Sequence, residues 1–294
     1  LTHMLELSEA LRAERAAGRV NEPMLAGQTL AMIFEKPSLR TRVSFEQAMY
    51  ELGGRALVLS QQEIGGLGQR EPIADTMRVL DGMVQAVAAR VFDHEALREL
   101  ERYASIPVIN MLSDLAHPCQ ALADVLTMRD AFGPELARRT VAFIGDANNV
   151  SRSLAMLCGK LGIHFIHASP PAYALGQAFA DRVMGQVPTM DFSLTHDPAE
   201  AVRRADVIYT DTFVSMGDEH EHHERVSAFD GFQVNDELLA DAPEHAIVLH
   251  CLPAHRGEEI TDAVMTGRRS RIFQQAHNRL HAQKGLLASL LGGK

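Results

Sequence analysis

Apolar runs of strand length alternate with helix-like segments along the whole chain, and this alternation limits the possible folds most. In the first half, helix-like segments lie near residues 41–52, 74–83 and 95–103. Strands that alternate with helices are typical of a parallel α/β protein. The strands predicted in this half are residues 30–34, 55–59, 87–91 and 107–110.

The second half repeats the alternation, and the length of the chain indicates two domains. At 294 residues the chain is too long for one typical core. A helical stretch over 120–132 ends at Gly133-Pro134 and is predicted to lead into a second domain. The predicted domains are 1–133 and 134–273, each a parallel sheet flanked by helices, with a C-terminal helix (274–294) that packs back on the first. The strands predicted in the second half are 140–144, 163–167, 207–209 and 246–250.

Polar, charged or reactive residues lie at or just after the ends of six of the predicted strands. Ligands of open parallel sheets bind beyond the carboxyl ends of the strands. Such residues at six ends favour a shared ligand cleft over a purely structural fold. The segments concerned are Ser38-Leu-Arg-Thr41, Arg90, 112–120, 146–149, 211–217 and Cys251-Leu-Pro253.

The turn after the first strand has the features of an anion site. Ser38 is placed to cap the helix that follows, and the first helical turn leaves backbone N–H groups available to an anion. Arg40 adds a guanidinium and Thr41 a hydroxyl at the same place. A surface turn with ordinary capping is the alternative interpretation.

His117 and Gln120 flank Pro118 just before a helix, so both are predicted to face a ligand at its first turn. His117 could instead cap the helix or bond a backbone carbonyl. Cys119 is predicted to be a small buried residue rather than a nucleophile.

Cys251 follows an apolar strand and is predicted to lie near Asp211, which ends another strand. A buried cysteine without a function is the alternative. His250 is interpreted as a packed histidine that supports its neighbours.

Composition excludes several classes of protein. The 28 Lys and Arg against 38 Asp and Glu give a net charge of −10, which argues against nucleic acid or an anionic membrane as a partner. Three scattered cysteines suit a reducing compartment. No apolar run of membrane length and no signal pattern is present, so a cytoplasmic location is expected, although the chain is expected to start late.

Two further segments suggest ligands only weakly. The loop 145–149 joins a strand to a helix but lacks the glycine spacing of a dinucleotide site. The run 218–224 carries His220, His222 and His223 and could bind a metal. Its consecutive ligands favour a solvated loop instead.

With these motifs in place, the chain resembles the aspartate/ornithine carbamoyltransferase family over nearly its whole length. Ser38-Leu-Arg-Thr-Arg42 is similar to the family's carbamoyl phosphate motif, and His117-Pro-Cys-Gln120 to its His-Pro-x-Gln motif. The segments 211–217 and 250–253 resemble the ornithine branch.

The resemblance implies transfer of a carbamoyl group from carbamoyl phosphate to the side-chain amine of ornithine, with no metal or other cofactor. It implies two α/β domains with the cleft between them, assembled as a trimer or a multiple of trimers. Arg90, His117, Asp211 and Cys251 would be catalytic. Ornithine would contact Asn149, Asp211, Ser215 and Met216. Carbamoyl phosphate would contact Ser38, Leu39 through its backbone, Arg40, Thr41, Arg90, His117, Gln120, Cys251, Leu252 and Arg279.

Two alternatives stay open: a carbamoyltransferase for a related amine, such as putrescine or an acylated ornithine, and a non-catalytic anion-binding protein.

Two positions also depart from the family pattern. Leu39 replaces a common Thr or Met, and Gly66 stands where many relatives carry Gln or His.

Overall fold

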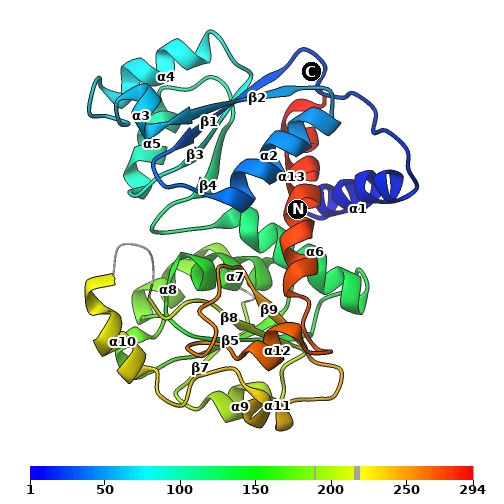
Figure 1. Cartoon of the computed structure of the whole chain (residues 1–294), viewed down its shortest axis with the longest axis vertical. Helices are drawn as coiled ribbons and strands as arrows, with labels where there is room; N and C mark the ends of the chain where they lie inside the picture. Colours follow the sequence, from blue (N-terminus) through cyan, green and yellow to red (C-terminus); the bar gives the residue numbers. More distant parts are fainter. Residues whose placement is uncertain (189, 215–218, 294) are drawn as a thin grey trace. The chain divides into compact units, whose positions relative to one another are not determined.

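The computed structural model describes residues 1–188, 190–214 and 219–293 (Figure 1). The chain divides into two compact units, one of residues 1–123 with 277–294 and one of residues 124–276. Each boundary falls inside a helix, α6 (Pro118–Phe132) and α13 (Ile272–Leu291). None of the helices in the described ranges combines the length and hydropathy that a membrane span needs.

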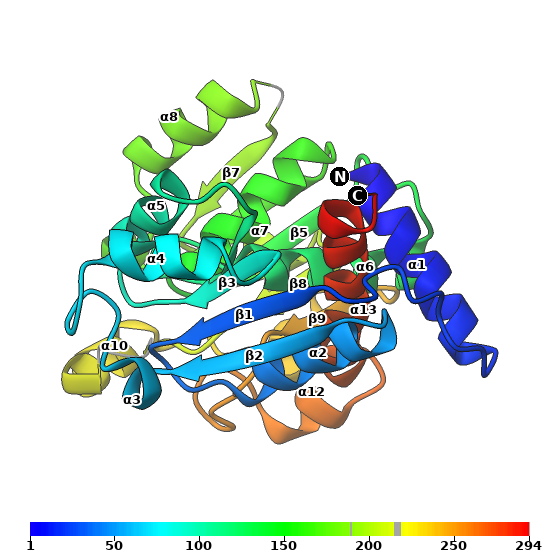
Figure 2. The ribbon, with the colours of Figure 1, turned by 90° about the horizontal axis from the view of Figure 1, so that it is seen from above.

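The first unit contains a four-stranded parallel sheet in the order β2-β1-β3-β4. Figure 2 shows β1 and β2 running side by side. All six residues of β1 are buried, because helices cover both faces of the sheet. Leu30, Met32 and Phe34 pack with α2 (Leu39–Glu51) and α13. The strands are β1 (Thr29–Phe34), β2 (Arg55–Ser60), β3 (Ala86–Arg90) and β4 (Val108–Leu112).

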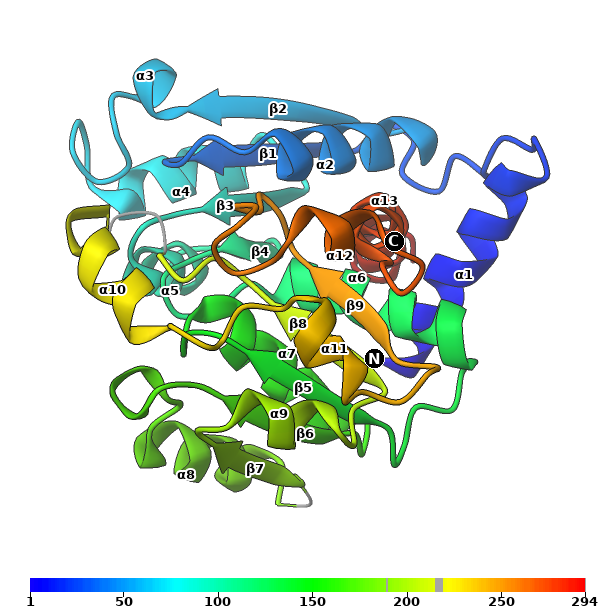
Figure 3. The same cartoon turned by 60° about the horizontal axis from the view of Figure 1, so that its bottom comes forward.

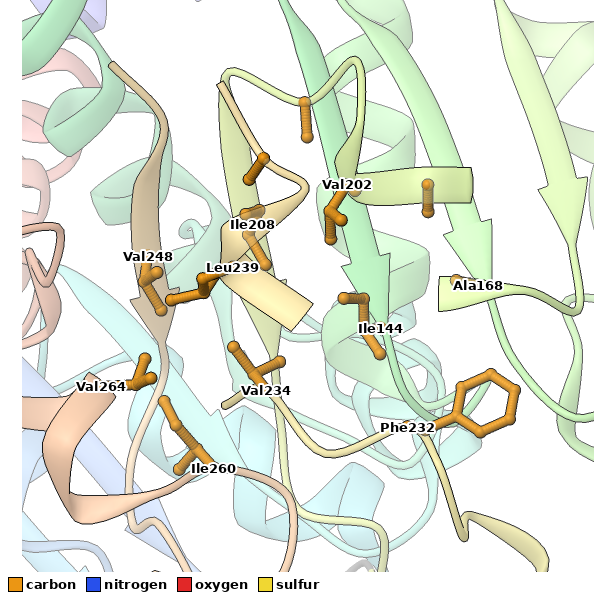
Figure 4. Close-up of a cluster of buried hydrophobic side chains, with 14 of the residues drawn as sticks. Ile144, Ala168, Val202, Ile208, Phe232, Val234, Leu239, Val248, Ile260 and Val264 are labelled. Atoms are coloured by element: carbon orange, nitrogen blue, oxygen red, sulfur yellow. The ribbon is translucent and has the colours of Figure 1, made fainter. Parts of the chain in front are cut away.

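The second unit contains a five-stranded parallel sheet in the order β7-β6-β5-β8-β9 (Figure 3). Helix α7 (Asn149–Lys160) packs on one face and α9 (Pro198–Val202) on the other (Figure 1). Ile144, Ile208 and Val248, from three neighbouring strands, belong to one buried cluster (Figure 4). The strands are β5 (Thr140–Ile144), β6 (His164–Ala168), β7 (Phe192–Thr195), β8 (Val207–Thr210) and β9 (Ile247–His250).

The remaining elements include α4 (Ile73–Asp81) and α5 (His94–Arg102), whose buried side chains pack with β1 and β3 of the first sheet. The others are α1 (Thr2–Ala16), α3 (Gln61–Ile64), η1 (Pro171–Tyr173), α8 (Gln177–Gln186), η2 (Glu219–Glu221), α10 (His222–Ala228), α11 (Asp236–Ala240) and α12 (Asp262–Thr266).

Two parallel α/β units confirm the predicted fold class. Each of the eight predicted strands has a counterpart displaced by at most two residues. No strand was predicted at β7, because this four-residue edge strand has partly exposed side chains and therefore a weak apolar pattern. The predicted domain boundary at 133–134 lies at the end of α6, whereas the compact units divide within that helix.

Candidate functional site

Each sheet has one place where the chain reverses the order of its strands. In the first unit this place lies between β1 and β3, and in the second between β5 and β8. Loops at such switch points are where open α/β sheets bind ligands. Predicted site residues form two groups near these points, and the second group also contains Asn148, which was not predicted. The anion cluster comprises Ser38, Arg40, Thr41, Arg90, His117, Gln120 and Arg279, and the thiol cluster comprises Asn148, Asp211, His250, Cys251 and Leu252.

Ser38 ends the turn after β1 and caps α2. Its backbone is extended, with φ of −159°, and its hydroxyl oxygen accepts from the N–H of Thr41 at 3.3 Å. The same hydroxyl donates to Thr41 Oγ1 at 2.9 Å. Leu39 begins the helix with a side chain that is 76% exposed, so a contribution to a ligand would come from its backbone. The local geometry is therefore that of a capped helix start with a buried threonine beside it.

Arg279 reaches the anion cluster from α13. Its guanidinium donates to Gln120 Oε1 at 2.5 Å and to Thr41 Oγ1 at 2.7 Å. All three side chains are buried. The contacts bring together residues from α2, α6 and α13, which are remote in sequence.

His117 lies buried among three arginines. Burial lowers the pKa of its imidazole well below the ordinary value, and the charges of Arg279, Arg90 and Arg40 lower it further. The ring is therefore neutral near pH 7 and can donate one N–H to a ligand oxygen. Cys119 is buried, and burial raises the pKa of its thiol to about 12, as suits a structural role.

In the thiol cluster, both carboxylate oxygens of Asp211 accept hydrogen bonds. Cys251 Sγ donates to Oδ1 at 2.9 Å, and Asn148 Nδ2 donates to Oδ2 at 2.8 Å. Asn148 also caps α7, because its Oδ1 accepts from the N–H groups of Val150 and Ser151. The helix cap thus fixes the amide that orients Asp211.

The hydrogen bonds of His250 define its tautomer. Its Nδ1 accepts from the backbone N–H of Leu252 at 2.9 Å, so the proton sits on Nε2. Nε2 donates to Glu259 Oε1 at 3.0 Å, and both side chains are fully buried. Because the N–H of Leu252 is used inside this turn, a backbone contact from Leu252 to a ligand would come from its carbonyl.

Gln275 is a second support of this turn that sequence reasoning missed. Its Oε1 accepts from the backbone N–H of His250 at 2.9 Å. Its Nε2 donates to Asp124 Oδ1 at 2.6 Å and to the hydroxyl of Tyr209 at 3.1 Å. The only sequence signal for the role of Gln275 is that it is a glutamine on the buried face of α13. Glu259 has no such signal, because it lies in a loop.

The structure describes all but two of the predicted site residues. Ser215 and Met216 are not among the described residues. Asn149 is the first residue of α7, next to the cap Asn148. Ligand-type atoms of Asp211, His250 and Cys251 lie within 4.8 Å of one another. Both ring nitrogens of His250 are already hydrogen-bonded, so this trio is not arranged to hold a metal in this conformation.

Family models match nearly all of the chain. The carbamoyl-P binding domain of aspartate/ornithine carbamoyltransferase matches residues 1–130, and the Asp/Orn binding domain matches residues 137–290. The chain belongs to the aspartate/ornithine carbamoyltransferase family. This confirms the resemblance inferred from the motifs.

Relatives within this family support the same assignment. Ornithine carbamoyltransferase of Methanopyrus kandleri is 49% identical, over 98% of this chain and 92% of its own length. The Bacillus subtilis protein of that name is 48% identical, over 99% and 93%. The structure of ornithine carbamoyltransferase from Pyrococcus furiosus matches with a TM-score of 0.95 and 46% identity, over 99% and 93%. The chain is therefore a carbamoyltransferase by family and by fold.

Proposed function

We propose that this protein transfers the carbamoyl group of carbamoyl phosphate to the side-chain amine of L-ornithine, giving L-citrulline and phosphate. The observation that carries the proposal is the anion cluster, in which buried Arg279 bonds both Thr41 and Gln120 beside a neutral His117. The relatives named ornithine carbamoyltransferase support ornithine as the acceptor.

The phosphate end of carbamoyl phosphate is assigned to the start of α2. Ser38, the backbone of Leu39, Arg40 and Thr41 would hold its oxygens, joined by Arg90 from the end of β3. Helix N-termini and arginine forks are favourable partners for phosphate. Concentrated arginines also explain how a protein with a net charge of −10 attracts an anion.

The carbamoyl end is assigned to His117, Gln120 and Arg279, with backbone contacts from Cys251 and Leu252. Attack on the carbonyl carbon places negative charge on its oxygen. Neutral His117, Arg90 and the hydroxyl of Thr41 would stabilise that charge. Expulsion of phosphate then breaks the carbon–oxygen bond to the leaving group.

The amine is assigned to the thiol cluster. A lysine-like amine has a pKa of about 10.4, so very little of it is neutral at pH 7. Asp211 would accept the proton that the amine releases, and the thiol of Cys251 holds the carboxylate at 2.9 Å. Asn149, Asp211, Ser215 and Met216 are the proposed ornithine contacts.

Each domain is assigned one of the two substrates. Domain 1–133, with the helix 274–294, is assigned to carbamoyl phosphate, and domain 134–273 to ornithine. A homotrimer or a multiple of trimers is supported by exposed apolar residues on α2, namely Leu39, Val43 and Tyr50. A cytoplasmic location is supported by three buried cysteines, none of which forms a disulfide in the described ranges.

Phosphate release from carbamoyl phosphate, measured separately with ornithine, putrescine and aspartate, tests the proposal. Of the three amines, we expect only ornithine to support turnover. Turnover with putrescine or aspartate at a comparable rate would reject ornithine as the specific acceptor. Phosphate release that depends on the protein but needs no amine acceptor would reject carbamoyl transfer to an amine. A Cys251→Ser variant with an unchanged kcat and pH profile would remove Cys251 from the mechanism.

A further inference from the structure

The turn that carries Cys251 is strained at the residue after the cysteine. Leu252 has a φ of 60°, in the left-handed region that residues other than glycine rarely adopt. Such a conformation persists only where the surrounding structure holds it. Two hydrogen bonds do so, because the backbone N–H of His250 donates to Gln275 and that of Leu252 donates to the ring of His250. The thiol of Cys251 therefore lies between two fixed backbone positions.

Gln275 fixes the first of these positions from outside the sheet. β9 is the edge strand of its sheet, so no further strand bonds its outer side. The backbone of Arg269 and Arg271 bonds Val248 on that side. Two residues further along β9, the N–H of His250 donates instead to a side chain, that of Gln275, at 2.9 Å. A single substitution can therefore remove this support without altering the backbone of the strand.

The partners of Gln275 leave its amide only one orientation. Its Nε2 donates to Asp124 Oδ1 at 2.6 Å and to the hydroxyl of Tyr209 at 3.1 Å, and all three side chains are completely buried. Burial raises the pKa of Tyr209, so its hydroxyl stays protonated. An ionised carboxylate can only accept, so the nitrogen of the amide must face Asp124 and its oxygen must face His250.

The adjacent Gln274 makes a similar contact between the same two helices. Its Nε2 donates to Asp130 Oδ2 on α6 at 3.0 Å, and this contact is exposed. Gln275 donates to Asp124, which also lies on α6. Both glutamines therefore join α13 to α6 within the second unit, and of the two it is Gln275 that also bonds His250.

We propose that Gln275 is a positioning residue for carbamoyl transfer. Through the N–H of His250 it holds the strained turn in the conformation that keeps the thiol of Cys251 2.9 Å from Asp211 Oδ1. This inference rests on the proposed function, in which Asp211 accepts the proton of the amine. Without Gln275 the turn would relax, the thiol would leave the carboxylate, and proton transfer to Asp211 would slow.

Gln275→Met tests this role, because methionine has a similar length and lacks the amide. We expect kcat to fall by at least about tenfold, as misplacement of a reacting group causes. KM for carbamoyl phosphate should change little. Gln274→Met is the matched control and should leave kcat unchanged, because the contact of Gln274 is exposed. Equal kcat values in the two variants would overturn the proposal.

An exchange of groups between Gln275 and Asp124 separates positioning from a general loss of structure. Gln275→Glu keeps an oxygen that can accept from His250 but sets a second carboxyl against Asp124. Adding Asp124→Asn restores a donor opposite an acceptor with the total charge of the pair unchanged. We expect this double variant to recover most of the kcat that Gln275→Met loses. A double variant no more active than Gln275→Met would overturn the proposal.

Alkylation of Cys251 by iodoacetamide, followed by mass spectrometry without substrates, reports on the turn directly. We expect Cys251 to react several times faster in Gln275→Met than in Gln274→Met, because its thiol is released from Asp211. Cys119 should react slowly in both, since burial raises the pKa of its thiol to about 12.

Equal alkylation rates of Cys251 in the two variants would overturn the positioning role. Because this measurement needs no turnover, it separates that failure from failure of the proposed function. A parent protein that transfers no carbamoyl group would reject the proposed function, and with it the role in transfer, even if the difference in alkylation remained.

Discussion

Arg279 is the residue on which the anion cluster depends most, because one guanidinium holds Thr41 and Gln120 together. A lysine cannot span both partners with a planar fork. We predict that Arg279→Lys lowers kcat by about 10²–10³, the cost of losing one oriented donor in a site of this kind. Steady-state kinetics checks this, with Arg268→Lys as a control because that arginine is exposed. A kcat within a factor of about two of the parent would contradict the assignment.

His117 gives a prediction about pH. Burial and the nearby arginines lower its pKa well below the ordinary value. Its neutral form should therefore persist through mildly acidic pH, and protonation should begin only well below the usual range. We expect no inflection in kcat/KM that can be assigned to His117 near its ordinary pKa. An inflection there that disappears in His117→Gln would show that the ring titrates normally.

At the scale of single elements, Asn148 links a helix end to the thiol cluster. Its side chain caps α7 and donates to Asp211 at 2.8 Å. We predict that Asn148→Ala costs about 1 kcal/mol of stability, as loss of a cap does, and also raises KM for ornithine. KM for carbamoyl phosphate should change little.

Asn235 provides the matched control for that prediction. It caps α11 through a hydrogen bond from the N–H of Leu238 at 2.9 Å. Asn235→Ala should cost similar stability in thermal unfolding without a change in KM for ornithine. Equal effects of the two variants on this KM would refute the role of Asn148.

An ion pair between the partly buried Glu51 and the fully buried Lys284 joins α2 to α13 in the first unit. Lys284 is fully buried and donates to Glu51 at 2.7 Å and to Asn21. Burial raises the pKa of Glu51, but hydrogen bonds from Lys284, Gln47 and Arg15 outweigh it and lower the pKa to about 2. The pair therefore contributes stability above the unfolded-state pKa, and that contribution is lost as pH falls from about 5 to about 2.

We predict that Glu51→Gln destabilises the protein by about 3–5 kcal/mol near pH 7, because it leaves the charge of Lys284 buried without its anion. The loss of stability between about pH 5 and 2 should also become shallower. Denaturant unfolding at several pH values measures both effects. Glu46→Gln is the control, since its pair with Arg42 is exposed and should matter by less than about 1 kcal/mol. Equal costs for the two variants would contradict the role of the pair with Lys284.

Sequence patterns identified the long, apolar elements and the residues that follow them. Strands such as β1 and β5 are buried along nearly their whole length, so hydrophobicity alone marks them. Because the strands could be located, the polar residues just after them, such as Ser38 and Asp211, could be identified as site candidates. The edge strand β7 escaped because its side chains are partly exposed.

The supporting residues could not be predicted, because their roles depend on tertiary contacts. Glu259 is a charged loop residue whose burial follows only from the packing of the second unit. Asn148 and Asn149 are adjacent and chemically alike, and only the cap geometry shows that Asn148 bonds Asp211. Local patterns carry no information of this kind.

At the scale of the whole molecule, the chain joins two parallel α/β units, each with polar residues at its switch point. One group is rich in arginine and suits an anion. The other pairs a thiol with a carboxylate and suits an amine. We propose that the first group binds carbamoyl phosphate and the second binds ornithine in one carbamoyl transfer.

A competition experiment with three amine acceptors tests this proposal. The protein is incubated with carbamoyl phosphate labelled in its carbonyl carbon and with equal concentrations of ornithine, putrescine and aspartate, and the labelled products are identified by mass spectrometry. We expect the label in citrulline, with only background amounts in the other two products. Label found mainly in carbamoylputrescine or carbamoylaspartate, or in no amine product at all, would contradict it.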